Sequence, residues 1–188
     1  MTGDTAERTD GELAALAIAG SEAAFAQIVR RHKQALHRLV AGIAGDEDEA
    51  LDIVQEAFVA AHGSLRRFDM ARSMRAWLAR IAINKARDHR RRRIVRRLIS
   101  IALPDNATDI PHEVPAVDQQ VGDRAELARV RSAIDRLPGR LRETLVLRTI
   151  EEFSQAQVAE ALGISEKAVE TRLYRARRQL SELLGDPD

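Results

Sequence analysis

The sequence predicts an all-α protein of two small helical domains joined by a flexible linker. Aromatic residues are only 3% of the 188-residue chain, whereas hydrophobic residues are 45%. Small and aliphatic side chains must therefore fill the cores, which is typical of helix bundles. Apolar residues recur at spacings of three and four in most segments, which indicates amphipathic helices. We expect domains at residues 10–97 and 123–185, with the linker at 98–122 between them.

Four helices are predicted in the N-terminal domain. Asp10 can cap a short helix that stops near Gly20, and Ser21 can cap a longer one. A third helix begins at Asp46, with Glu49 at the capping-box spacing. Away from its apolar face, this helix carries an acidic stripe of Asp48, Asp52, Gln55 and Glu56. Such a stripe is either a solvated surface or a docking face for a basic partner.

The fourth helix begins at Ser73, and one of its flanks mixes unusual side chains. Five residues at spacings of three and four form a stripe there: Trp77, Arg80, Asn84, Asp88 and Arg91. Side chains that stack on or read bases stand beside side chains that bind phosphate. The alternative for Trp77 is a half-buried core position.

Charge is segregated along the chain, although the net charge is only +1. The end of the fourth helix carries a run from Arg90 to Arg93, which exceeds what the capping of a helix requires and indicates contact with a polyanion. Residues 98–122 then contain Pro104, Pro111, Pro115, several acids and no lysine or arginine. This composition, without clear periodicity, favours an extended acidic linker.

The C-terminal domain is expected to begin with two helices that complete a bundle. The first, from Asp123 to Leu137, should turn Leu127, Val130, Ile134 and Leu137 inward. The second starts near Pro138 and should bury Leu141, Leu145, Val146 and Ile150.

The last part of the chain reads as a helix-turn-helix. Ser154 and Gln157 form a capping box for a helix that ends near Leu162, Gly163 makes the turn, and Ser165 caps the next helix. That helix packs inward through Val169, Leu173, Ala176 and Leu180. Its other side is polar and mostly basic, which suits a helix in a DNA major groove: Lys167, Glu170, Thr171, Arg172, Tyr174, Arg175 and Arg178. The alternative is an ordinary helical hairpin with a solvated basic face.

Several classes of site are disfavoured. The chain has no cysteine, and its five histidines lack ligand spacing, so we expect neither a metal nor another cofactor. The N-terminus has no apolar segment of the kind found in signal peptides, and no run of apolar residues could span a membrane. A soluble, cytoplasmic protein that is not an enzyme is expected.

Three motifs in this order carry a family resemblance: DIVQEAFVAAHGSLRRFD, MRAWLARIAINKARDHRRRR and LPGRLRETLVLRTIEEFSQAQVAEALGISEKAVETRLYRARRQL. Together they resemble a bacterial extracytoplasmic-function sigma factor, a specificity subunit of RNA polymerase. The resemblance covers residues 10–184. It implies a sigma region 2-like N-terminal bundle, a sigma region 4-like C-terminal bundle and a role in promoter recognition, melting and transcription initiation. Its implied partners are core RNA polymerase, promoter DNA and an anti-sigma factor that responds to stress.

The resemblance also implies residue roles. Asp52, Gln55, Glu56 and Phe58 fall in the segment that meets the polymerase. The loop Leu65 to Asp69, with Phe68, matches the part that captures a flipped base of the minus-ten element, and the Trp77 stripe matches the helix that melts and reads this element. The Lys167 to Arg178 helix matches the reader of the minus-thirty-five element, and the linker matches a segment that threads through polymerase channels.

Two positions depart from the family pattern. Met74 stands where an aromatic residue is common, and methionine can fill such a gap. Glu170 stands where a basic or small polar residue is frequent; a carboxylate can accept from cytosine but repels phosphate. Two other functions stay open at this point. One is a helix-turn-helix regulator that works without core polymerase, and the other is a sigma-like decoy that binds an anti-sigma factor.

Overall fold

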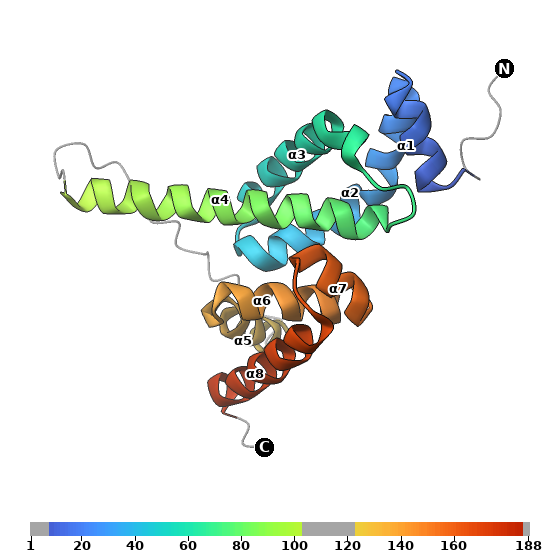
Figure 1. Ribbon diagram of the computed structural model, residues 1–188. Helices are drawn as coiled ribbons and strands as arrows, with labels where there is room; N and C mark the ends of the chain where they lie inside the picture. The colour runs from blue at the N-terminus through green and yellow to red at the C-terminus, as the bar shows by residue number, and fades with distance from the viewer. Residues whose placement is uncertain (1–7, 103–122, 186–188) are drawn as a thin grey trace.

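The computed structural model describes residues 8–102 and 123–185, and every regular element in these ranges is helical, as predicted (Figure 1). The N-terminal bundle consists of α1 (Asp10–Ile18), α2 (Glu22–Ala44), α3 (Glu47–Ser64), the 3-10 turn η1 (Leu65–Arg67) and α4 (Met74–Ala102). The C-terminal bundle consists of α5 (Asp123–Arg136), α6 (Gly139–Leu145), the π-helical turn η3 (Val146–Ile150), α7 (Gln155–Leu162) and α8 (Glu166–Leu184).

Side-chain caps fix the starts of the N-terminal helices. Ser21 and Asp46 cap α2 and α3 as predicted. The cap of α1 was predicted one residue too late: it is Thr9, whose hydroxyl and backbone form a reciprocal capping box with Glu12. Asp10 instead receives bonds from α2, at 3.0 Å from Arg31 and 2.9 Å from His32. The apolar face of α3 is buried throughout: Ala50, Val54, Ala57, Phe58 and Ala61.

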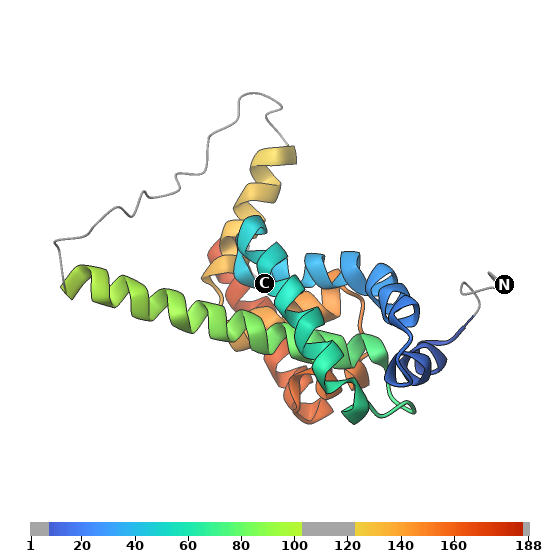
Figure 2. The same cartoon turned by 90° about the horizontal axis from the view of Figure 1, so that it is seen from above.

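Helix α4 is longer than predicted. It continues to Ala102, so the first five residues of the predicted linker, 98–102, are helical. Figures 1 and 2 show its C-terminal half projecting beyond the other helices, where Ile94, Val95, Leu98 and Ile99 are exposed. The rest of the predicted linker, 103–122, with its prolines and acids, lies outside the described residues.

Two inward positions predicted for the C-terminal bundle are wrong. Leu127 of α5 is 64% exposed and Ile150 is 46% exposed. Ala133, Leu137, Leu145 and Ala176 are buried, and Leu180 packs against the last three of them. Leu127 lies nearly three turns before Leu137, in the N-terminal half of α5.

The two bundles pack against each other through one continuous core. Val146, Leu147 and Phe153 of the C-terminal bundle are buried in the same cluster as the apolar residues of α2 and α4. Helix α7 contacts α4, and η3 contacts α2, so that the C-terminal bundle lies beneath these helices in Figure 1. The predicted domain limits, 10–97 and 123–185, stay predictions.

Candidate nucleic-acid interface

The helix-turn-helix forms through the local signals that predicted it. The Ser154–Gln157 capping box starts α7, Gly163 ends it in the left-handed conformation at φ 65°, and the Ser165 side chain accepts a bond from the Ala168 amide at the start of α8. Glycine adopts this φ without a Cβ clash. On α8, Val169, Leu173 and Ala176 are buried, which directs the opposite side of the helix outward.

Six of the seven predicted DNA-reading residues of α8 lie together on that outer side, whereas Arg172 lies next to the buried face, between Val169 and Ala176. These six are exposed and Arg172 is half-buried: Lys167, Glu170, Thr171, Tyr174, Arg175 and Arg178. Local ion pairs hold two of the cations, because Lys167 pairs with Glu170 at 2.8 Å and Arg178 pairs with Glu182 at 3.1 Å. Arg175 is exposed on the same side of the helix.

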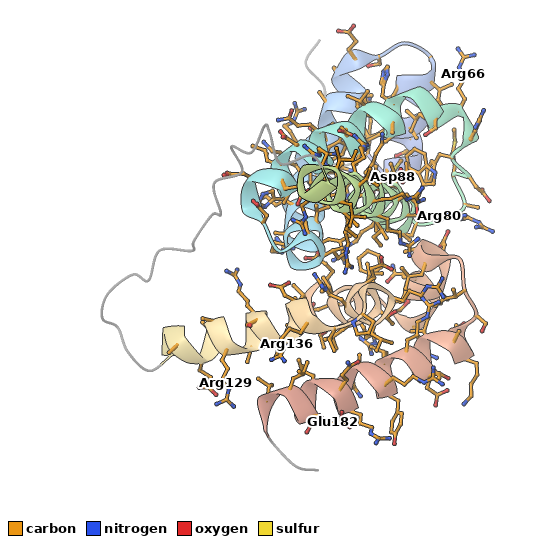
Figure 3. The ribbon with its side chains drawn as sticks, turned by 90° about the vertical axis from the view of Figure 1, so that its left-hand side faces the viewer. Arg66, Arg80, Asp88, Arg129, Arg136 and Glu182 are labelled. Carbon is orange, nitrogen blue, oxygen red and sulfur yellow. The ribbon has the colours of Figure 1, made fainter. Side chains whose placement is uncertain are left out.

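The predicted minus-ten residues form a second array along α4. Arg80, Asn84, Asp88 and Arg91 are exposed on one flank, and Arg80 and Asp88 are labelled in Figure 3. Trp77 is half-buried, with its ring centroid 5.2 Å from that of Phe68. The two rings border a cavity of about 250 Å³ that Arg67, Arg72 and Arg80 also line. Phe68 itself is only 6% exposed, so it supports the Trp77 ring from behind.

The predicted polymerase-binding residues are split between two sides of α3. Asp52, Gln55 and Glu56 line a surface cavity of about 570 Å³ with Lys85 and His89 of α4. The bond from His89, 2.8 Å from the carboxylate, is the main reason that the pKa of Glu56 lies below its ordinary value. Phe58 points away from this surface into the core. Val59, which no sequence pattern singled out, is 74% exposed and lines the same cavity.

Buried charges at the seam between the bundles were also missed. Glu143 is 3% exposed and binds Arg87 with two bonds of 2.6 and 2.8 Å. Glu151 is 2% exposed and pairs with Arg38 and Arg75, both at 3.2 Å. These partners are between 56 and 113 residues apart in the chain. No local pattern signals such pairs, because each side chain alone resembles one on a solvated helix flank.

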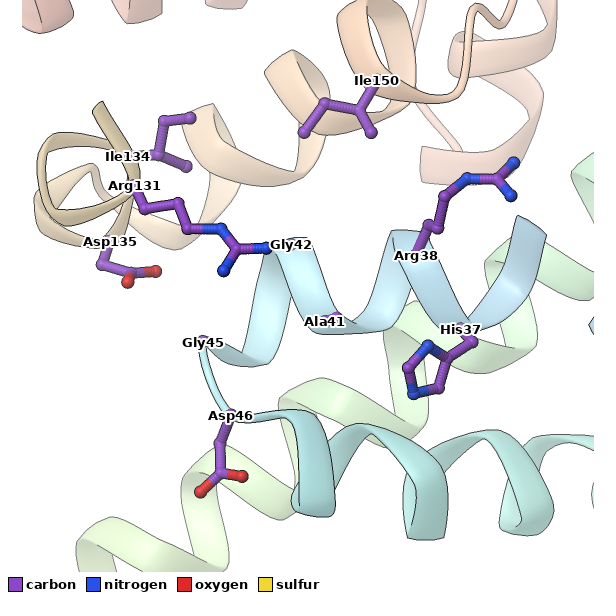
Figure 4. Close-up of a pocket in the computed structure, with 10 residues that line it drawn as sticks. All are labelled: His37, Arg38, Ala41, Gly42, Gly45, Asp46, Arg131, Ile134, Asp135 and Ile150. Carbon is purple, nitrogen blue, oxygen red and sulfur yellow. The ribbon is translucent and has the colours of Figure 1, made fainter. Parts of the chain in front are cut away.

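Arg142, which is 6% exposed, is a third buried charge in this seam. Its guanidinium donates to the backbone oxygen of Ile43 at 2.9 Å, to the backbone oxygen of Leu137 at 3.3 Å, and to Asp135. Burial lowers the pKa of Arg142 below its ordinary value, and the charge of Asp135 opposes this effect. Beside it, α2 and α5 enclose a cavity of about 290 Å³, across which Arg131 points toward α2 (Figure 4).

Within residues 8–102 and 123–185, histidine, aspartate and glutamate side chains nowhere gather in a group of three or more that could hold a metal ion. In the same ranges, no helix has both the length and the apolar character that crossing a bilayer requires.

Comparison with known proteins shows the family. The family description "Sigma-70 region 2" matches residues 28–95, and "Sigma-70, region 4" matches residues 127–180. The RNA polymerase sigma factor CnrH of Cupriavidus metallidurans is 42% identical over 182 residues, which are 95% of each chain. The ECF RNA polymerase sigma factor SigM of Mycobacterium tuberculosis is 33% identical over 95% of this chain and 86% of its own.

Solved structures agree with these matches. CnrH in complex with the cytosolic domain of CnrY superposes with a TM-score of 0.70 at 39% identity, over 95% of this chain and 99% of that one. The sigma factor RpoE in complex with the anti-sigma factor NepR, from Bartonella quintana, gives 0.67 at 25% identity, over 87% and 98% of the two chains. The chain therefore belongs to the extracytoplasmic-function family of RNA polymerase sigma factors, and it is a non-enzymatic subunit that directs transcription initiation.

Proposed function

We propose that this sigma factor reads its promoters through two separate helical surfaces. The outer face of α8 binds the upstream, minus-thirty-five element, and the α4 flank from Trp77 to Arg91 binds the minus-ten element. The observation that carries the proposal is the one-sided exposure of α8: a buried apolar face directs basic and polar side chains outward together. A helix of this kind fits the major groove, with its first turns at base edges and its arginines at phosphates.

Melting is assigned to the pocket at the start of α4. Extrusion of a base costs a few kcal/mol of stacking and pairing, and stacking on an aromatic side chain returns about 1–3 kcal/mol. Trp77 presents the ring for this stacking, and Phe68 holds that ring from behind at 5.2 Å. Arg80 lines the same cavity and supplies a phosphate contact for the extruded strand.

Core polymerase binds the acidic side of α3. Asp52, Gln55 and Glu56 surround the exposed Val59, so an apolar contact lies inside a polar rim. Acidic side chains at such a rim steer a basic partner and set its orientation. Phe58 packs into the core on the other side of α3, so it positions this helix and does not contact the polymerase.

The two DNA-binding surfaces act together because they belong to one chain. When the first surface binds DNA, the second is held at a raised effective concentration, so neither needs to bind tightly alone. Promoter selection therefore depends on both elements.

An anti-sigma factor is the proposed regulator. RpoE, whose structure resembles this chain, was solved with the anti-sigma factor NepR, and CnrH with the cytosolic domain of CnrY. By analogy, an anti-sigma factor holds this protein inactive in the cytoplasm until a stress or envelope signal releases it for its regulon.

Run-off transcription with purified core polymerase tests the proposal. The wild-type protein should direct initiation without another sigma subunit, and sequencing of transcript starts should show two shared upstream elements. Asp52→Lys should abolish initiation through loss of core binding, whereas Glu126→Lys, an exposed position on α5, should not. The polymerase-binding assignment is wrong if the two variants behave alike, and the two-surface proposal is wrong if only one promoter element is shared.

A further inference from the structure

The seam between the bundles pairs acids of the C-terminal bundle with arginines of the N-terminal bundle. Three carboxylates from the former each meet one or two guanidinium groups from the latter. The pairs are Glu143 with Arg87 at 2.6 Å, Glu151 with Arg38 and Arg75 at 3.2 Å, and Glu160 with Arg72 at 3.6 Å. Glu143 and Glu160 therefore place negative charge beside the α4 flank that is proposed to bind DNA. Glu151 binds its two arginines elsewhere in the seam.

The pair between Arg87 and Glu143 stands on the DNA-reading flank of α4. Arg87 follows Arg80 by seven residues and Asn84 by three, so all three lie on one side of the helix. Arg87 also donates to the Asn84 side-chain oxygen at 3.3 Å. The hydrogen bonds from Arg87 to Glu143 are the main reason that the pKa of Arg87 is raised.

The geometry of this pair is that of phosphate recognition. Arg87 Nε and Nη2 donate to the two oxygens of the Glu143 carboxylate at 2.8 and 2.6 Å. A guanidinium group binds a carboxylate and a phosphate through the same two parallel N–H bonds. The Glu143 carboxylate thus occupies a position at which Arg87 could hold a backbone phosphate.

Helix α7 covers the other end of the same flank. Glu160 lines the cavity that Trp77, Phe68 and Arg80 border. At the turn after α7, a Cβ built on Gly163 would lie 3.9 Å from Arg80 Nη2. A flipped base and its phosphates could not enter this cavity from the α7 side while the bundles are packed together.

We infer that Arg87 is a further promoter-phosphate contact, and that Glu143 occupies it in the packed chain as an internal substitute for DNA. The inference rests on the proposed role of the α4 flank. The C-terminal bundle competes with DNA for this flank, so the apparent DNA affinity of the free chain is the intrinsic affinity multiplied by the fraction of open molecules.

Fluorescence anisotropy with the full-length protein tests the inference. The probe is a short fluorescein-labelled duplex with a single-stranded tail, since phosphate contacts do not depend on sequence. Glu143→Gln should bind it about tenfold more tightly than wild type, because a hydrogen-bonded charge pair that favours the closed form is lost. Glu126→Gln removes the same charge from an exposed position of the same bundle and should leave the affinity within about twofold.

Arg87→Ala separates the DNA contact from the opening of the chain. Arg87→Ala breaks the same ion pair but also removes the proposed phosphate ligand, so its affinity for the probe should not exceed that of wild type. The Arg87→Ala/Glu143→Gln variant should bind the probe as tightly as Arg87→Ala alone. The Arg87→Ala plot of log affinity against log salt should be less steep than that of Glu143→Gln by about 0.9, the value of one phosphate contact. If Arg87→Ala tightens binding as Glu143→Gln does, or if Glu143→Gln gives no gain, the inference is overturned.

A reversible lock tests the competition directly. A Cβ built on Gly42 lies 3.1 Å from Val146 Cγ1, and the chain has no cysteine of its own. The Gly42→Cys/Val146→Cys pair is therefore close enough for a disulfide between α2 and η3. The oxidised protein should lose probe binding at least tenfold relative to its own reduced form, and circular dichroism should show both forms folded. Equal binding by both forms would refute the competition.

These outcomes are distinct from failure of the proposed function. If the wild-type protein directs run-off transcription while the anisotropy series fails, only the role of Arg87 and Glu143 is wrong. If run-off also requires another sigma subunit, the proposed function itself is wrong.

Discussion

Replacement of Trp77 tests the melting surface most sharply. The side chain is half-buried against Phe68 and borders a cavity of about 250 Å³. Truncation of a buried tryptophan to alanine costs about 3–5 kcal/mol; a half-buried ring should cost about half of that. A loss of about 2 kcal/mol leaves a domain of ordinary stability folded. Trp77→Ala should therefore give a folded protein without its stacking surface.

The expected functional effect of Trp77→Ala is on promoter melting. Loss of one base–aromatic stack, about 1–3 kcal/mol, corresponds to a decrease of about 5- to 150-fold in the open-complex equilibrium. Permanganate reactivity of promoter thymines in the holoenzyme complex measures melting, and filter binding at low temperature measures the closed complex. We expect the first to fall and the second to change little, while Trp77→Phe retains most of the melting.

The control for Trp77→Ala is its stability, measured by urea unfolding with circular dichroism, because the chain has only one tryptophan and the variant therefore lacks indole fluorescence. An unchanged permanganate pattern in a folded Trp77→Ala protein would refute the stacking role. Loss of closed-complex binding and of folding together would instead identify Trp77 as a core residue.

Three further predictions concern the other surfaces and the core. Arg175→Ala should weaken binding to the upstream element by about 1–3 kcal/mol in a gel-shift titration, if Arg175 makes a bidentate base contact, and leave core binding intact. Phe153→Ala should lower the urea-derived free energy of unfolding by about 3–5 kcal/mol, because this buried ring packs in the shared core with the Arg75 guanidinium 4.4 Å from its centroid. Asp10→Asn should destabilise the protein at neutral pH by about 1 kcal/mol, through loss of the bonds from His32 and Arg31.

The effect of Asp10→Asn should depend on pH. The bond from His32 is the largest cause that holds the pKa of Asp10 below its ordinary value of 3.8. The folded state therefore binds fewer protons than the unfolded state, and the contribution of Asp10 is complete above about pH 4 and lost as the pH falls through the lowered folded-state pKa. The difference between wild type and variant should shrink from pH 5 to pH 3; a constant difference would contradict this assignment.

Matched variants control the other two predictions. Arg136→Ala removes an exposed arginine from α5 and should not change upstream-element binding. If Arg136→Ala weakens binding to the upstream element as much as Arg175→Ala does, the loss reflects the total positive charge of the domain and not a specific contact of Arg175. Leu127→Ala, at an exposed position, should change stability by less than about 0.5 kcal/mol. A loss below about 1 kcal/mol for Phe153→Ala would mean that the two bundles do not share a core in solution.

The features that the sequence predicts best are helix caps and turns, because residues close together in the chain determine them. The caps at Ser154 and Ser165 and the turn at Gly163 form through bonds over three or four residues, so the helix-turn-helix was recognised in detail. The α1 cap was placed one residue late because Thr9 and Asp10 are both capping residues. The reciprocal bond with Glu12 selects Thr9.

What the sequence did not reveal depends on packing between distant helices. Leu127 continues the apolar pattern of α5, but no described helix covers it, so periodicity alone misplaced it. Glu143 and Arg87 are each ordinary helix residues, and only the approach of α6 to α4 brings them together. Periodicity did predict which side of α8 is buried, because Val169, Leu173 and Ala176 recur at spacings of four and three. The DNA-reading role of the exposed side stays a prediction.

Arg142 of the C-terminal bundle donates a hydrogen bond to the backbone oxygen of Ile43 in α2. Contact between the two bundles therefore helps to hold the C-terminal end of α2. Ile43 lies in the last turn of α2, where carbonyl groups lack partners within the helix, and a side chain from the other bundle supplies one. Separation of the bundles should therefore let the end of α2 fray. The amides around Gly45 would then exchange with deuterium faster in any form of the protein whose bundles have separated. Their exchange rate therefore reports this separation without an attached probe.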